Sequence, residues 1–229
     1  MSEAVGTRRQ FGEGPLSRVA ALIYSLLVVG LLLLLTTAPG VVALLLLERD
    51  ASNLPLFAAC ALPLGPALSA ALYALHRHRP DLTDLHPARA FWRGYRANVR
   101  GVLAIWLPWL LWLTVVAANL TYFAAAAVPD WWRVPLVLVA VVATLWGVNA
   151  LVITSLFRFR VRDVARLALY FLVRDPVVAL GNAGVLLAAV LVTAFASEAV
   201  LGLLGSPLVL ALLRTCRPMI SKIEKEFTA

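Results

Sequence analysis

The chain has 229 residues, of which 62% are hydrophobic and 14% are charged, and its formal net charge is +8 at pH 7. Soluble globular domains carry about 25% charged residues, so the composition excludes an ordinary soluble domain and predicts an integral membrane protein. The positive charge does not predict nucleic-acid binding, because no soluble domain is left to present the grooves or stacking platforms that such binding needs.

Six apolar stretches are the candidate membrane-spanning helices, since about 20 residues at 1.5 Å each cross the hydrocarbon layer. They are residues 19–47, 54–75, 101–128, 134–157, 176–197 and 199–213. The first is long, and we expect Pro39-Gly40 to kink or end it. The last is short and crosses only if Arg214 and Arg217 reach along the helix to the interface or the bilayer thins. The predicted fold class is therefore all-α, a polytopic membrane bundle of six transmembrane helices.

Basic residues are distributed very unevenly between the connections. Eighteen of the 20 Lys and Arg residues lie in the N-terminal segment, the second and fourth connections and the C-terminal tail, whereas the other connections hold only Arg49 and Arg133. The positive-inside rule then places both termini on the cytoplasmic side of the membrane. The predicted organisation is a cytoplasmic segment 1–18, a transmembrane domain 19–213 with cytoplasmic loops 76–100 and 158–175, and a cytoplasmic basic tail 214–229.

The second connection contains a predicted helix with one basic face. Pro87 suits a first turn, with Asp81, Thr83 or Asp84 as the cap, and Arg89, Arg93, Arg96 and Arg100 then recur at helical spacing beside aromatic residues. This pattern is typical of a helix that lies in the membrane interface. In the fourth connection Arg158, Arg162 and Arg166 are four residues apart. Both sets predict either lipid anchoring that orients the chain or a docking surface for a cytoplasmic or membrane partner.

Three asparagines lie inside the predicted spans: Asn119, Asn149 and Asn182. Hydrogen bonds between helices explain such residues, and a polar substrate path is the alternative. No ionisable residue lies at mid-membrane, where such residues mark carriers and pumps. His76 and His78 have no acidic or Cys partners nearby, so we expect no metal site. With no nucleotide-binding glycine loop and no catalytic triad, we expect neither an enzyme nor a cofactor.

Two proline-containing stretches, Pro63-Leu64-Gly65-Pro66 and Gly205-Ser206-Pro207, are expected to break the helical hydrogen-bond ladder. Matched breaks in two repeated halves would indicate a transporter, but no repeat relates the halves of this chain, so we interpret them as packing kinks. Trp106, Trp109 and Trp112 recur every three residues, which favours a packing or lipid-facing surface over a sugar-binding platform.

Several stretches together resemble the YesL family of bacterial membrane proteins. They are Leu62-Pro63-Leu64-Gly65-Pro66-Ala67-Leu68-Ser69-Ala70-Ala71-Leu72-Tyr73, Phe91-Trp92-Arg93-Gly94-Tyr95-Arg96-Ala97-Asn98, Leu180-Gly181-Asn182, Arg217-Pro218-Met219 and Glu226-Phe227-Thr228. The resemblance implies an association with carbohydrate uptake, especially with ATP-driven sugar importers.

The sequence thus predicts a membrane accessory or scaffold subunit, associated with an ATP-driven carbohydrate import system. A small-solute transporter or channel is the alternative, and a membrane enzyme or cofactor carrier is a weaker third. The expected partners are the lipid bilayer and either importer permease and ATPase subunits or further copies of the chain.

Overall fold

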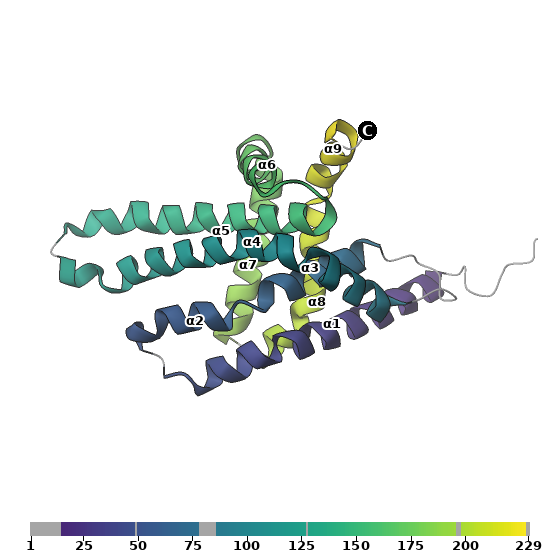
Figure 1. The fold of residues 1–229 in the computed structure, drawn as a ribbon, viewed down its shortest axis with the longest axis horizontal. Coiled ribbons are helices and arrows are strands. Elements are labelled where there is room, and N and C mark those ends of the chain that lie inside the picture. The colour runs from purple at the N-terminus through teal and green to yellow at the C-terminus, as the bar shows by residue number, and fades with distance from the viewer. Residues whose placement is uncertain (1–14, 49, 78–85, 127, 196–197, 228–229) are drawn as a thin grey trace, which may run out of the picture.

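The computed structural model describes residues 15–48, 50–77, 86–126, 128–195 and 198–227. Within these ranges the regular structure is helical, as Figure 1 shows. The long helices are α1 (Pro15–Leu46), α2 (Leu54–Cys60), α3 (Leu64–His76), α4 (Pro87–Thr121), α5 (Arg133–Leu156), α6 (Val161–Arg174), α7 (Pro176–Phe195), α8 (Glu198–Thr215) and α9 (Arg217–Phe227). Short 3-10 helices in the described ranges are Ala51–Asn53, Phe123–Ala126 and Asp130–Trp132.

The predicted all-α membrane fold is confirmed. In the described part of the chain, five spans are long and apolar enough to cross a membrane, with α2 and α3 together forming one of them. A sixth is present if Val200–Thr215 and Arg217–Glu226, which are bent by 52° relative to each other, are counted as one span. The sixth predicted helix therefore corresponds to α8, and α9 continues it after the bend.

The candidate membrane spans run in two main directions (Figure 1). In that view α1, α4 and α5 lie along the long axis of the molecule, whereas α7 and α8 run across them. Helix α3 packs against α1, α4, α5 and α8. Its residues Ala67, Ala70 and Ala71 are fully buried, and small side chains of this kind let helix backbones approach closely. The centre of the fold is thus built around α3.

The expected end of the first helix at Pro39-Gly40 is wrong, and Pro207 lies inside its helix as well. Helix α1 continues through Pro39 and Gly40 to Leu46, and a Cβ atom on Gly40 would lie 2.2 Å from the carbonyl oxygen of Cys60. Gly40 therefore serves close packing instead of ending the helix. Helix α8 likewise runs through Pro207, and the Ser206 hydroxyl donates a hydrogen bond to the carbonyl of Leu26 in α1 at 2.7 Å.

The expected break in the second apolar stretch is confirmed. Helix α2 ends at Cys60 and α3 begins at Leu64, because Pro63 and Pro66 have no N–H to continue the ladder. The carbonyl of Ala61 at this break accepts a hydrogen bond from the indole N–H of Trp106 in α4, at 3.1 Å.

The second connection differs from its predicted form. Its basic helix starts at Pro87 as expected but does not end before residue 101, because α4 is one helix of 35 residues from Pro87 to Thr121. Such a helix is about 52 Å long, against about 30 Å for the hydrocarbon layer, so roughly two fifths of it extends beyond a layer that it crosses upright. The residue before α4 is His86. The proposed caps, together with Arg8, Arg9, His78 and Arg79, lie outside the described residues.

Candidate functional site

The four predicted arginines of α4 form an exposed surface, which we call the α4 basic face: Arg89, Arg93, Arg96 and Arg100. Three of them surround a surface hollow that is also lined by Trp92 and Ala97. Within the described part of the chain, no carboxylate lies at ion-pair distance from these arginines. Their guanidinium groups are therefore available to an anionic ligand or partner.

The opposite side of α4 determines which way these arginines point. Phe91 is fully buried, and a Cβ atom on Gly94 would lie 2.8 Å from the Tyr73 side chain of α3. The Asn98 amide donates to the carbonyl of Ser155 in α5 at 2.8 Å and to the Ser69 hydroxyl in α3 at 3.3 Å. These contacts hold one side of α4 against α3 and α5, so the basic face points outward.

Helix α6 carries a second exposed set, the α6 basic face, which consists of Arg162 and Arg166. Its other side is buried through Val164, Ala168 and Phe171, which are spaced for one face of a helix. Arg158 is exposed as well but precedes the helix, since Arg160 has extended backbone angles (φ −68°, ψ 149°) and α6 starts at Val161. The expected helical triplet is thus reduced to two residues, with Arg158 in the connection.

An apolar cleft of about 640 Å³ lies beside the α6 basic face. It is lined by residues of α4 (Ala104, Ile105, Pro108, Trp109, Trp112), α5 (Leu138, Val139, Val142, Ala143, Trp146) and α6 (Val161, Ala165, Leu169). The Trp109 indole donates to the carbonyl of Ala143 at 2.8 Å, and the Trp146 indole donates to the carbonyl of Ala165 at 3.1 Å. These bonds link the three walls of the cleft. Trp109 thus serves packing, as predicted, whereas Trp112 is exposed in the lining of the cleft.

Two of the three predicted asparagines meet inside the bundle. The Asn182 amide nitrogen of α7 donates to the Asn149 amide oxygen of α5 at 2.9 Å, and both residues are fully buried. The Asn182 oxygen accepts from the Thr215 hydroxyl at 2.8 Å and from the Cys216 thiol at 3.3 Å. The Asn149 amide nitrogen donates to the carbonyl of Ala168 in α6 at 3.5 Å. This polar cluster joins four helices near one end of α5.

The third asparagine lies apart from this cluster. Asn119 is exposed near the far end of α4, and its amide donates to the carbonyl of Val115 one turn earlier, at 2.7 Å. The three amides therefore do not line one path. The two that meet are 33 residues apart in the chain, and no spacing rule in the sequence predicts such a contact.

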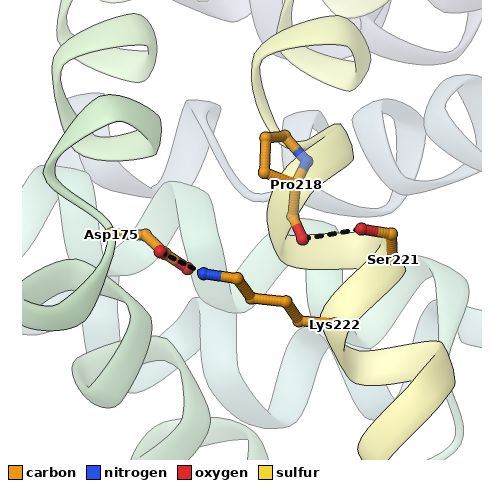
Figure 2. Close-up of polar contacts among 4 residues, drawn as sticks. All are labelled: Asp175, Pro218, Ser221 and Lys222. Atoms are coloured by element: carbon orange, nitrogen blue, oxygen red, sulfur yellow. Dashed lines mark hydrogen bonds and ion pairs between the residues drawn. The ribbon is translucent and has the colours of Figure 1, made fainter.

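Figure 2 shows an ion pair that ties the last helix to the bundle. Lys222 of α9 bonds to one carboxylate oxygen of Asp175, which lies between α6 and α7. The second oxygen of Asp175 is buried without a hydrogen-bond partner among the described residues. The neighbouring Arg174 guanidinium lies 5.6 Å from the centre of the Tyr170 ring.

The described residues contain no group of three or more His, Cys, Asp or Glu side chains that could hold a metal ion. The distinctive chemistry of the site is therefore that of exposed guanidinium groups, an apolar cleft and buried amides. No family model matches the chain, and no curated protein or solved structure matches it either.

Proposed function

We propose that this chain is an integral membrane accessory or scaffold subunit that holds another membrane protein against its α6 basic face and apolar cleft. The proposal includes the bacterial plasma membrane and a cytoplasmic location for both termini, as the distribution of Lys and Arg favours. The observation that carries it is the adjacency of exposed arginines and an apolar cleft on the same helix, α6.

The two surfaces suit one kind of partner. Val161, Ala165 and Leu169 of α6 line the cleft, and Arg162 and Arg166 occupy the neighbouring positions of the same helix. A transmembrane helix of a partner would fill the cleft with apolar side chains, and carboxylates at its cytoplasmic end would pair with the arginines. Helix α6 itself is anchored by Val164, Ala168 and Phe171, so it presents a preformed surface.

The identity of the partner comes from the resemblance to the YesL family. That resemblance favours the permease and ATPase subunits of an ATP-driven carbohydrate importer. A second copy of the chain is the alternative occupant of the cleft.

Affinity purification in a mild detergent tests the proposal in cells that express an importer of this class. We expect permease or ATPase subunits to copurify with the full-length chain, and we expect the variant R162Q/R166Q to recover at least about tenfold less of them, because two charge-assisted contacts are removed. The matched control R93Q/R96Q removes the same charge from α4 and should recover the partner normally. Recovery of the chain alone from cells that contain the importer would contradict the proposal.

A transporter or channel is the second candidate. It would require the buried amide pair of Asn149 and Asn182 to open toward a permeating solute. Flux into liposomes tests this function. Rates for sugars and ions that equal those of empty vesicles would reject it, whereas flux that N149L/N182L abolishes would support it over the scaffold.

A further inference from the structure

We propose that the α4 basic face binds the headgroup of an anionic phospholipid, whose acyl chain lies along Leu107 and Leu111 of the same helix. This assignment concerns α4 and does not rest on the partner proposed for α6.

The hollow on α4 has the chemistry of a phosphate site. Arg89, Arg93 and Arg96 surround it, and the small side chain of Ala97 forms part of its lining. Arginine binds phosphate oxygens through paired N–H donors. Trp92, which is 40% exposed, completes the rim. The centre of its ring lies 6.0 Å from that of Phe91 and 5.7 Å from that of Tyr95, in edge-to-face arrangements. Tryptophan is enriched at the headgroup level of membranes, so this rim fits a lipid better than a dissolved anion.

The continuity of α4 places an apolar track on the same side of the helix as the hollow, beyond Arg100. Because the helix is unbroken from Pro87 to Thr121, Leu107 follows Arg89 after about five turns and Leu111 follows Arg93 after about five turns, on the same side of the helix. Both leucines are open to the surroundings, with 49% and 68% of their surface exposed. Arg96 and Leu107 are about 16 Å apart along the axis, close to half of the hydrocarbon thickness of about 30 Å.

The second basic face lacks this geometry. Helix α6 is seen almost end-on in Figure 1, whereas α4 and α5 are seen lengthwise. An acyl chain that follows α4 or α5 into the membrane therefore does not follow α6. For this reason the phospholipid site is assigned to α4 and not to every exposed group of arginines. The arginines of α6 supply the matched control.

Native mass spectrometry of the full-length protein tests the assignment in detergent supplemented with either phosphatidylglycerol or phosphatidylcholine. We expect the wild type to retain phosphatidylglycerol in preference to phosphatidylcholine. R93Q/R96Q should reduce the bound phosphatidylglycerol by about tenfold or more, because two charge-assisted contacts are lost. R162Q/R166Q removes the same net charge and should stay within about twofold of the wild type. Size-exclusion profiles and helical circular dichroism confirm that each variant is folded.

Three results would overturn the assignment. Equal losses of bound phosphatidylglycerol in R93Q/R96Q and R162Q/R166Q would show that the arginines act only through net charge. Retention that is unchanged in R93Q/R96Q would exclude the hollow as the site. Displacement of the lipid by inorganic phosphate at equal concentration would show that the acyl chain contributes nothing, so a phosphate site and not a lipid site would be present.

Discussion

The indole N–H of Trp106 in α4 donates a hydrogen bond to the carbonyl of Ala61 at 3.1 Å, at the break between α2 and α3. The same carbonyl accepts only a short-range bond from the N–H of Leu64, at 3.2 Å. A backbone carbonyl left poorly bonded inside a membrane is costly, because lipid offers no replacement for water. Trp106 therefore supplies, from another helix, a second hydrogen bond to a carbonyl that lies at the break between α2 and α3.

Replacement of Trp106 by Phe should destabilise the protein by about 1–2 kcal/mol, because the aromatic ring is kept while the donor to Ala61 is lost. Thermal unfolding in detergent measures the change. The control is Trp112→Phe, since Trp112 is 53% exposed and has no hydrogen bond through its indole in the described structure. Equal destabilisation by both substitutions would show that the bond to Ala61 contributes nothing specific.

Replacement of Gly147 by Ala should lower the free energy of unfolding by about 1–3 kcal/mol, because the added methyl group overpacks the contact between α4 and α5. A Cβ atom there would lie 2.4 Å from the Trp109 ring, and the bond from that ring to Ala143 limits how far it can move. Gly184→Ala is the control, because nothing lies within 4 Å of its Cβ position. That variant should be neutral or more stable, by up to about 1 kcal/mol from helix propensity. A larger loss of stability in Gly184→Ala than in Gly147→Ala would refute this account.

Replacement of Asn182 by Ala should destabilise the bundle more than replacement of Asn119 by Ala, because Asn182 bonds to Asn149, Thr215 and Cys216 whereas Asn119 bonds only within its own helix. A double-mutant cycle between Asn149 and Asn182 should give a coupling of about 0.6–2 kcal/mol. Unfolding in detergent supplies the four free energies. Additive effects of the two substitutions would mean that the contact between the amides contributes nothing to the free energy of unfolding.

Replacement of Lys222 by Gln should loosen α9 without detaching it, because the carboxylate of Asp175, whose side chain is only 14% exposed, loses its cationic partner while Met219 and Ile223 of α9 stay buried in the core. Partial exposure of Lys222 screens the pair, so we expect about 1 kcal/mol or less in global stability. The sensitive measurement is hydrogen exchange across Arg217–Phe227, which should become faster. Lys225→Gln, at an exposed position, should leave exchange unchanged. The double variant D175N/K222Q should recover part of the protection, and a failure of K222Q to alter exchange would contradict a role for the pair.

Local sequence was sufficient to predict most of the helices. The apolar stretches correspond to α1, the α2–α3 pair, the membrane part of α4, and α5, α7 and α8, because hydrophobic length is a property of consecutive residues. The helix start at Pro87 and the break near Pro63 followed from the backbone chemistry of proline. The outward arginines of α4 followed from helical periodicity.

The positions of charged residues do not mark where α4 begins and ends. The arginines before residue 101 suggested an interface helix separate from the third span, but α4 continues through them, because Arg is a good helix former and Gly101 does not interrupt the ladder. The prolines at 39 and 207 do not end their helices either. Neighbouring helices hold α1 and α8 in place there, through Gly40 against Cys60 and through the bond from Ser206 to Leu26.

The sequence by itself determined that this chain belongs in a membrane and where most of its helices lie. Both follow from the hydrophobicity and the spacing of consecutive residues. Only the tertiary structure decided the choice of partners: Trp106 with Ala61, Asn149 with Asn182, and Lys222 with Asp175. Each of these contacts joins residues far apart in the chain, and the physical reason is packing. A polar group buried away from water bonds to whatever donor or acceptor the arrangement of helices brings within reach.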